Sequence, residues 1–343
     1  MKEISITQPD DWHLHVRDGA ALLSSVPFTA RQFKRAIIMP NLAKPVVNVE
    51  MALAYRNRIL DATPQNIMFD PLMTLYLTNK TSREGIKQAS QSKHVHAAKL
   101  YPAGATTNSD KGVSKIDDLW PVFEQMEIEQ LPLLVHAEVT DTDIDIFDRE
   151  QVFIDLHLSS IREAFPELPI VLEHATTAQA VEFVKNYKHT AATLTPQHLL
   201  FNRNALLVGG IQPHNYCLPI LKRETHREAL ITAATSGDPK FFLGTDSAPH
   251  TKQAKENSCG CAGCFTAHAA MELYTEIFDA EDALDKLEAF SSFYGADFYR
   301  LPRNKSTITL IKKEWQAPKS YPFAEHSIVP FRHEQALQWQ IAD

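Results

Sequence analysis

The sequence predicts an α/β protein, a (β/α)8 TIM barrel with a short C-terminal extension. First, eight short segments rich in β-forming residues recur along the 343 residues. Second, segments of helical character lie between most of them, and strands that alternate with helices form parallel sheets. Third, several strands are almost continuously apolar, as expected when both faces are buried. Eight such units in a chain of this length favour a closed barrel over an open sheet.

The predicted elements follow one another in chain order. The strands span residues 5–16, 35–41, 66–77, 96–102, 131–138, 169–176, 189–199 and 240–247. Residues 47–62 place apolar side chains at the spacing of one helix face, and residues 176–187 open on a threonine that can cap a first turn. A loop containing cysteine and glycine follows near 251–265. We expect a C-terminal extension, from about 301 to 343, to pack on the barrel within a single domain of residues 1–343.

Composition excludes several classes of protein. The formal net charge of −8 argues against general nucleic-acid binding but not against a small anionic substrate. No apolar run approaches the roughly 18 residues of a membrane span, and the N-terminus lacks the apolar core of a secretory signal. Four cysteines are no disulfide framework. We therefore predict a cytoplasmic protein that acts on a small molecule, without nucleic-acid or membrane partners.

Metal-binding residue types recur at the ends of the predicted strands. His13 and His15 stand two residues apart in DWHLHVRDG, so they share one strand face and can share one metal ion. Taken alone, such a pair is more often two polar residues on a half-exposed strand. Four further candidates end later strands: Lys99, His136, His174 and Asp246. Because a barrel brings all these ends to one rim, the pattern predicts a metal centre there.

The same pattern resembles a known family. The amidohydrolase superfamily has H-x-H on the first strand, a lysine on the fourth, histidines on the fifth and sixth, and an aspartate on the eighth; this sequence matches at all these positions. The strings DWHLHVRDG, MPNLAKPVV, KLYPAGATTNS, LVHAEVT, LEHATT, TPQHLL, GTDSAPH and CGCAGCF look like the bacterial single-domain dihydroorotases. The resemblance runs from about residue 10 to residue 265 and thinly to the end.

The resemblance implies a binuclear zinc centre with two Zn²⁺ per subunit. An ammonium group cannot bind a cation, and the resemblance implies that Lys99 carries a carbamate (N6-carboxylysine) that bridges both metals. The resemblance assigns His13, His15 and Asp246 to one zinc, and His136 and His174 to the other. It implies reversible cyclisation of N-carbamoyl-L-aspartate to (S)-dihydroorotate and water in pyrimidine biosynthesis. A bridging hydroxide would be the nucleophile and Asp246 the general acid and base. Cobalt or manganese could replace zinc.

Substrate selection calls for a cation near the metals. Arg17 shares the strand face of His15 and offers a bidentate fork for a carboxylate, unless it pairs with Asp18 or another carboxylate. Asn41 ends the second strand and is either a substrate donor or a turn residue. The resemblance assigns the substrate carboxylate to Arg17, Asn41 and His250. It adds backbone contacts near Leu218 and Ala262.

A loop after the fourth strand resembles a mobile lid. Thr106 and Thr107 occupy the positions that close over substrate in the family, although an ordinary surface loop is the alternative. Gly104 stands where the family string has asparagine and adds backbone freedom. The resemblance also implies a homodimer.

Other conspicuous residues receive weaker interpretations. Cys259, Cys261 and Cys264, with Cys217 far upstream, make an incomplete zinc site, so a loop lining the active site is favoured. His198 lies at the same rim and could support the site from behind. Five histidines are predicted to be surface or packing residues: His157, His189, His214, His226 and His268.

Two other functions remain as alternatives. A hydantoinase or allantoinase would share the metal centre but not the carboxylate pocket. A non-catalytic relative of the fold would lack the metal ligands.

Overall fold

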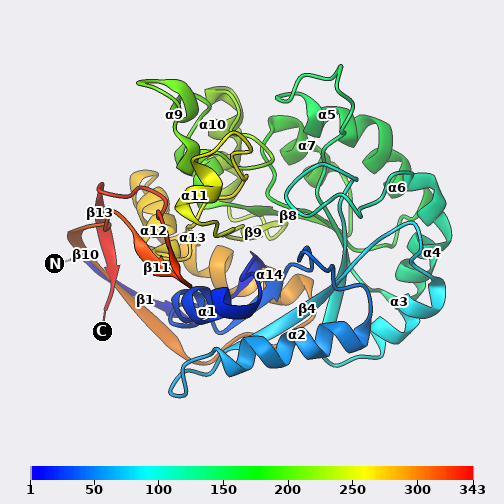
Figure 1. Cartoon of the computed structure of the whole chain (residues 1–343), viewed down its shortest axis with the longest axis horizontal. Helices are drawn as coiled ribbons and strands as arrows, with labels where there is room; N and C mark the ends of the chain where they lie inside the picture. Colours follow the sequence, from blue (N-terminus) through cyan, green and yellow to red (C-terminus); the bar gives the residue numbers. More distant parts are fainter. Residues whose placement is uncertain (1, 343) are drawn as a thin grey trace.

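The computed structural model describes residues 2–342 and contains one eight-stranded parallel sheet, in the order β2-β3-β4-β5-β6-β7-β8-β9 (Figure 1). The strands are β2 (Asp11–Leu14), β3 (Arg35–Ile38), β4 (Asp70–Tyr76), β5 (Val95–Leu100), β6 (Leu133–Val135), β7 (Ile170–Leu172), β8 (Thr190–Leu194) and β9 (Phe241–Leu243). Sequential order with parallel pairing throughout confirms the predicted barrel.

The first and last strands meet at their carboxyl ends. Asp246 N donates to the carbonyl oxygen of His13 at 2.9 Å, and His15 N donates to that of Ser247 at 3.1 Å. The buried carboxylate of Asp11 accepts from Thr245 N at 2.9 Å and from Thr245 Oγ1 at 2.6 Å. These bonds close the barrel at the rim where the predicted metal ligands lie.

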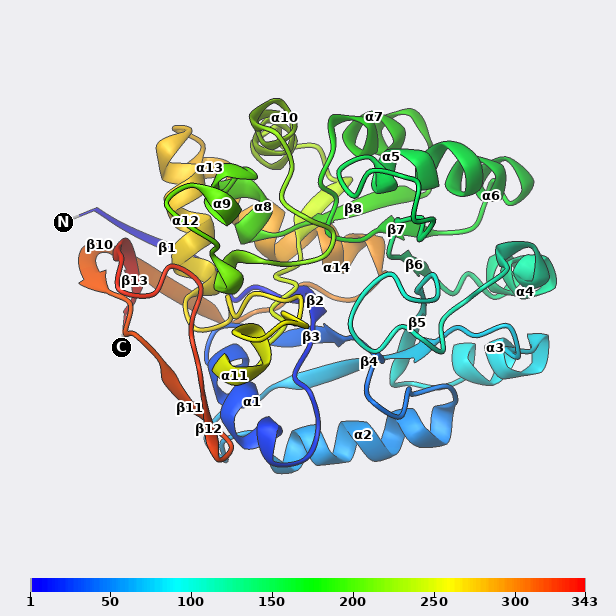
Figure 2. The ribbon, with the colours of Figure 1, turned by 45° about the horizontal axis from the view of Figure 1, so that its top comes forward.

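Most helices lie around the outside of the sheet, and short helices also lie at its ends (Figure 2). They are α1 (Leu22–Ala30), α2 (Val49–Asp61), α3 (Arg83–Ser90), α4 (Trp120–Glu129), α5 (Arg149–Phe153), α6 (Ser159–Ala164), α7 (Ala178–Asn186), α8 (Pro196–Leu200), α9 (Asn204–Leu207), α10 (Glu224–Thr235), α11 (Lys252–Lys255), α12 (Ala270–Ala280), α13 (Leu284–Glu288) and α14 (Tyr294–Phe298). Both helices named from the sequence are confirmed. Asn48 caps α2 through Met51 N at 2.9 Å, and Thr177 caps α7 through Ala180 N at 3.1 Å.

Each barrel strand is shorter than its predicted segment, and two of the predicted segments are interrupted. Residues 5–16 are not one strand: β1 (Glu3–Thr7) pairs with the C-terminal region, and the barrel strand β2 starts at Asp11, after Pro9. Residues 189–199 were also predicted as one strand, but β8 ends at Leu194. There Thr195 caps α8 and Pro196 takes its first position, where a missing N–H costs nothing. In both cases a proline marks the break.

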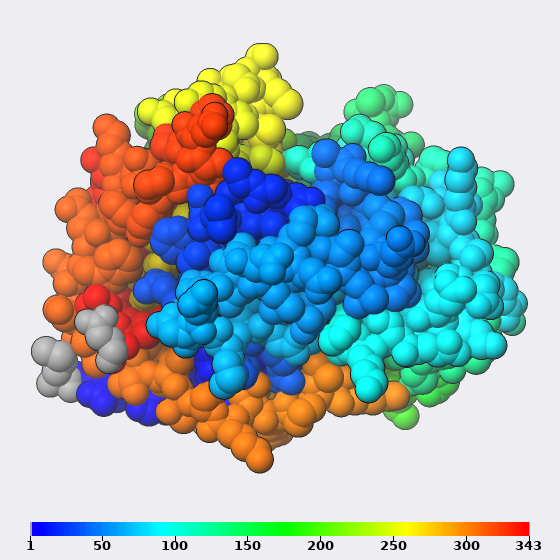
Figure 3. Space-filling view, turned by 60° about the horizontal axis from the view of Figure 1, so that its bottom comes forward, coloured from blue at the N-terminus to red at the C-terminus, as the bar shows by residue number. Residues whose placement is uncertain are grey.

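The C-terminal extension contributes strands to two small antiparallel sheets beside the barrel. It consists of β10 (Thr307–Gln316), β11 (Tyr321–Phe323), β12 (His326–Ile328) and β13 (Ala336–Ile341). Strand β10 pairs antiparallel with both β1 and β13, so the two ends of the described chain share one sheet. Figure 3 shows these orange and red segments covering one side of the molecule next to the blue N-terminal helices.

The barrel interior is filled at the end opposite the rim. Alternate strand residues point inward and form one apolar layer: Trp12, Ile37, Met39, Leu72, Ala97, Leu134, Val171, Ala191 and Phe242. Tyr299, directly after α14, stacks on Trp12 with ring centroids 4.8 Å apart. Gly295 packs against the same indole, where a Cβ atom would lie 2.1 Å from Trp12 Nε1. Only the rim end is therefore left for polar chemistry. Among residues 2–342, no helix has the length and apolar character that crossing a bilayer requires.

Candidate active site

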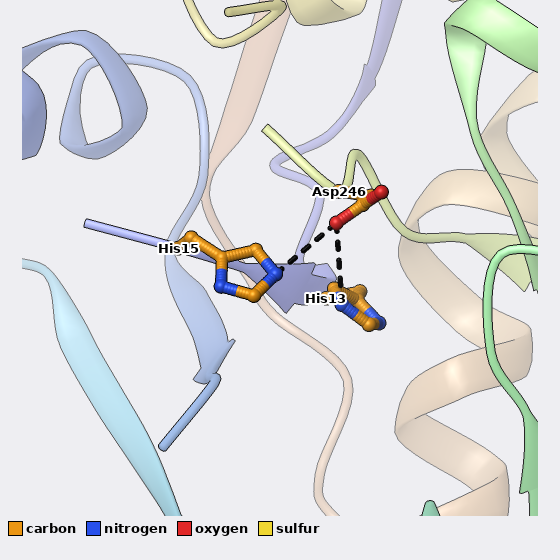
Figure 4. A group of neighbouring side chains, drawn as sticks. All are labelled: His13, His15 and Asp246. Carbon is orange, nitrogen blue, oxygen red and sulfur yellow. Dashed lines mark ion pairs between the residues drawn. The ribbon is translucent and has the colours of Figure 1, made fainter. Parts of the chain in front are cut away.

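The predicted metal ligands converge at the rim. His13, His15 and Asp246 each direct a ligand atom to a common point, with all these atoms within 4.8 Å of one another (Figure 4). Asp246 Oδ1 lies 3.1 Å from His15 Nε2 and 3.4 Å from His13 Nε2. The His174 ring lies next to both His13 and His136. Its centroid is 5.0 Å from that of His13 and 4.7 Å from that of His136. One cavity is lined by all these side chains.

Lys99 lies beneath this cavity, inside β5. Its side chain is fully buried, and its ammonium stands 5.1 Å from the centre of the Tyr101 ring. Burial lowers the pKa of Lys99 to about 8, although the nearby carboxylates of Glu173 and Asp246 work against this shift. The neutral fraction of Lys99 near neutral pH is therefore larger than that of an ordinary lysine.

Carboxylates orient two of the histidines from behind. Glu173 Oε2 lies 2.8 Å from His13 Nδ1 and also accepts from Thr193 Oγ1 at 2.6 Å. Glu138 Oε2 lies 2.7 Å from His136 Nε2. Each hydrogen bond occupies one nitrogen of its histidine ring and leaves the other nitrogen available to bind a metal. Sequence reasoning missed both acids. Their positions, two residues after His136 and directly before His174, were the available signal.

Several buried polar atoms at this centre fit metal ions. Within residues 2–342, His13 Nε2, His174 Nδ1 and Lys99 Nζ have no hydrogen-bond partner. Buried polar groups are almost always paired, so the two unpartnered imidazole nitrogens in one place indicate a cation site. Burial also lowers the pKa of His13, His15 and His174, which keeps the rings neutral, as ligation requires. The donor set of histidines and carboxylate suits zinc.

Asp246 remains ionised in this setting. Burial by itself raises the pKa of Asp246, but the hydrogen bond with His15 and the neighbouring imidazoles outweigh it, and the pKa stays below its usual value. The backbone at Asp246 is left-handed, with φ of 45°, as it is at His174 (42°) and Arg17 (64°). Such conformations are costly for residues other than glycine and gather at functional sites.

A glycine permits this packing. Gly244 lies where β9 approaches β8 and β2. A Cβ atom there would stand 2.6 Å from Thr193 Cβ and 3.0 Å from His13 Cβ. The position requires glycine because the backbone approaches two side chains that hold the metal centre.

Loops supply the cationic side of the pocket. Arg17 donates from Nε to the Pro249 carbonyl at 2.8 Å, and its NH2 group lies 2.7 Å from His250 Nε2. Asp18 pairs instead with Arg58, at 2.8 Å, so Arg17 is not neutralised by its neighbour. Burial and the charge of Arg17 lower the pKa of His250 to about 2, which keeps that imidazole neutral.

The loop after β5 lies over the cavity. Asn41 Nδ2 donates to the Thr107 carbonyl at 3.1 Å, and Asn108 Nδ2 donates back to the Asn41 carbonyl at 3.1 Å. On the far side, Thr107 Oγ1 donates to the Ala262 carbonyl at 3.4 Å. Thr106 and Leu218 also line the cavity beneath this bridge, and its free volume is about 20 Å³. This is room for little more than one water molecule.

Comparison with known proteins identifies the family. The profile of the Amidohydrolase family matches residues 9–314. A dihydroorotase of Nitrosococcus oceani is 59% identical over 341 residues, with 99% of each chain covered. The chain belongs to the dihydroorotase family. A dihydroorotase of Acaryochloris marina is 60% identical over the whole of both chains.

Solved structures agree with this family. A Campylobacter jejuni dihydroorotase superposes with a TM-score of 0.91 at 37% identity, covering 99% of this chain and 98% of that one. A Saccharomyces cerevisiae dihydroorotase in complex with 5-fluoroorotic acid has a TM-score of 0.90 at 31% identity, covering 100% and 99%. An Arthrobacter aurescens L-hydantoinase, at 12% identity and a TM-score of 0.79, shares the fold alone.

The structure also bears on two weaker interpretations of the sequence, which concern His198 and the cysteines. His198 is buried and has both ring nitrogens occupied: Nδ1 lies 2.7 Å from Thr195 Oγ1, and Nε2 lies 2.9 Å from the Pro219 carbonyl. It supports the chain next to Leu218 rather than binding a metal. Cys264 and Cys217 are buried, whereas Cys259 is exposed. Within residues 2–342, the cysteines form no group with metal-ligand geometry.

The five histidines that were predicted to be surface or packing residues lie outside the lining of the cavity. His189 is exposed, and His268 is buried against the C-terminal extension, with Nε2 2.8 Å from the Phe331 carbonyl. The other three are partly buried: His157, His214 and His226. Sequence reasoning did not identify Tyr101, Ala248 and Gly263, which also line the cavity. These residue types carry no recognisable sequence signal.

Proposed function

We propose that this chain catalyses the reversible cyclisation of N-carbamoyl-L-aspartate to (S)-dihydroorotate and water in pyrimidine biosynthesis. One observation carries the proposal. Five metal-competent side chains line one pocket next to the buried Lys99, and the same pocket is lined by Arg17, which contacts the neutral imidazole of His250. The first group suits amide hydrolysis, and the second suits a substrate with a free carboxylate.

Two zinc ions are the proposed cofactor. His13, His15 and Asp246 would hold one ion, and His136 and His174 the other. Lys99 would join both after its neutral amine adds carbon dioxide and releases a proton, which leaves an anionic carbamate. The lowered pKa of Lys99 supplies that neutral amine. Bound zinc supplies Lewis acidity, which polarises the amide carbonyl and lowers the pKa of water.

Asp246 is the proposed general acid and base. In ring opening it accepts a proton from the attacking water and then donates it to the departing ring nitrogen. Its lowered pKa and its closeness to His13 and His15 support this role, because they favour an ionised carboxylate beside the proposed metal ligands. Ring closure removes a carboxylate charge and consumes a proton, so low pH favours the ring.

The substrate carboxylate is assigned to Arg17, Asn41 and His250, with backbone contacts at Leu218 and Ala262. The Arg17 guanidinium would supply the positive charge, and the neutral Asn41 and His250 side chains would orient the carboxylate. Thr106 and Thr107 belong to a lid in this proposal. The small volume under their loop supports it, because a substrate can reach the metals only after the loop moves.

The proposal includes a cytoplasmic homodimer of single-domain subunits. The resemblance to the family supports the dimer, and sedimentation of the purified protein tests it. A sedimentation mass of one subunit of 38.7 kDa would contradict it.

The function is tested by metal content and by cyclisation of N-carbamoyl-L-aspartate, in the wild type and in Asp246→Asn. We expect about two zinc ions per chain, loss of activity on chelation, and a decrease in kcat of at least about a thousandfold in the variant. Full activity in a metal-free preparation contradicts the proposal, whereas an active Asp246→Asn contradicts only the acid–base role. Hydantoin serves as the control substrate, and turnover of hydantoin above that of dihydroorotate would indicate a hydantoinase.

A further inference from the structure

A buried lysine outside the metal centre ties two pocket loops together. Lys255, the last residue of α11, is 4% exposed. Its Nζ donates to the carbonyl oxygens of Tyr216 at 2.9 Å, Cys261 at 2.9 Å and Gly263 at 2.6 Å. An ammonium group has three donors, and here each one has its own acceptor. Bonds from a buried charge are stronger than those between neutral groups.

These carbonyls flank the backbone that the substrate would contact. Ala262 lies between Cys261 and Gly263, and Leu218 lies two residues after Tyr216. The two segments also bind each other directly, since Gly263 N donates to the Tyr216 carbonyl at 3.0 Å. Both Leu218 and Ala262 line the cavity, whereas Lys255 does not.

The carbonyl oxygen of Ala262 contacts side chains from two other loops of the pocket. It lies 3.0 Å from His250 Nε2 and 3.4 Å from Thr107 Oγ1. A shift of the Ala262 peptide would therefore disturb the His250 imidazole, which lies beside Arg17, and the loop over the cavity. Lys255 anchors the chain on both sides of that peptide.

We propose that Lys255 is a positioning residue for substrate binding, which holds the Leu218 and Ala262 backbone at the spacing that the substrate requires. The inference rests on the proposed function of the pocket. Lys255 touches no reacting atom. Because the same backbone contacts would hold both substrate and transition state, their loss raises KM more than it lowers kcat.

The test compares Lys255→Met with Lys252→Met. The control removes a lysine from the same short helix whose exposed Nζ is 3.8 Å from Glu256. Steady-state cyclisation of N-carbamoyl-L-aspartate gives kcat and KM, and calorimetry gives the Kd of 5-fluoroorotic acid. For Lys255→Met we expect KM and Kd to rise about tenfold or more, with kcat within about threefold and zinc content unchanged. Lys252→Met is expected to match the wild type.

Lys255→Gln keeps the test decisive if Lys255→Met does not fold. It retains two N–H donors without the charge, and we expect a smaller rise in KM and Kd. A folded Lys255 variant with wild-type KM and Kd overturns the proposal, as does a fall in kcat with KM unchanged. A wild type that binds zinc but does not cyclise N-carbamoyl-L-aspartate counts against the proposed function instead.

Discussion

Whereas His13 and Lys99 belong to strands of the barrel, Arg17, Asn41 and Ala262 lie on loops above its rim. The strand side is held by the parallel backbone ladder and by buried carboxylates such as Glu173. The loop side is held largely by hydrogen bonds from side chains to backbone, such as Asn41 to the Thr107 carbonyl and Lys255 to the carbonyls of Tyr216, Cys261 and Gly263. A metal centre needs fixed geometry, and a pocket that admits a substrate needs parts that can move.

The largest expected effect comes from Gly244→Ala, which disturbs the strand side. The added methyl meets Thr193 and His13 at distances that require β2 or β8 to shift. We expect roughly 1–3 kcal/mol of destabilisation and at least about a hundredfold loss of activity with loss of zinc. Denaturation curves, metal analysis and kinetics measure these effects. Gly85→Ala on α3, where the Cβ meets only Ser82 Oγ at 3.5 Å, is the control. Full zinc content and activity in Gly244→Ala would show that the strand side tolerates displacement.

Glu173→Gln weakens the strand side without adding volume. The amide keeps one acceptor but loses the charge that orients His13 and raises its basicity. We expect zinc affinity to fall about 10- to 100-fold, as measured by competition with a chelator. The exposed side chain of Glu167, which lies 3.3 Å from His189, provides the control Glu167→Gln. Equal zinc affinity in Glu173→Gln and the wild type would mean that the carboxylate does not orient His13.

Asn41→Ala acts on the loop side. It removes the bond to the Thr107 carbonyl and the proposed contact with the substrate carboxylate. We expect KM to rise about tenfold while kcat changes little and zinc remains bound. Steady-state kinetics and metal analysis separate these effects, and the exposed Asn66→Ala is the control. A loss of zinc from Asn41→Ala would contradict the division of the site into two sides.

The smallest expected effect is a change in the pH dependence of stability from the loop side. The pKa of His250 is about 2 in the folded chain, because of burial and Arg17, and near 6.5 in an unfolded chain. Between these values the unfolded chain binds the additional proton, so stability is full above pH 6.5 and falls as pH decreases. The loss is at most about 1.4 kcal/mol per pH unit.

His250→Gln is expected to reduce this acid-side loss in the metal-free protein, as measured by urea denaturation at pH 7.5, 6 and 5. The exposed imidazole of His326 provides the control His326→Gln. An identical slope in His250→Gln and the wild type would show that His250 titrates normally. The strand-side histidines, whose pKa values are also lowered by burial, continue to contribute in both proteins.

Local sequence reasoning succeeded where one rule covers several residues. The period of two along a strand placed His13 and His15 on one face, and barrel topology brought His136, His174 and Asp246 to the same rim. It failed where a contact depends on distant segments. Strand β1 pairs with β10, so Ile4 lies beside Leu310, and nothing near residue 4 indicates that partner.

The sequence by itself determined the barrel, its strand order and the residue types available at its rim, because these follow from periodicity and from the short range of β/α connections. Only the tertiary structure decided which carboxylate holds which histidine, and that Lys255 joins the loops at Tyr216 and Ala262. Such contacts need side chains from separate segments to meet within hydrogen-bond distance. Their geometry exists only after the whole chain has packed.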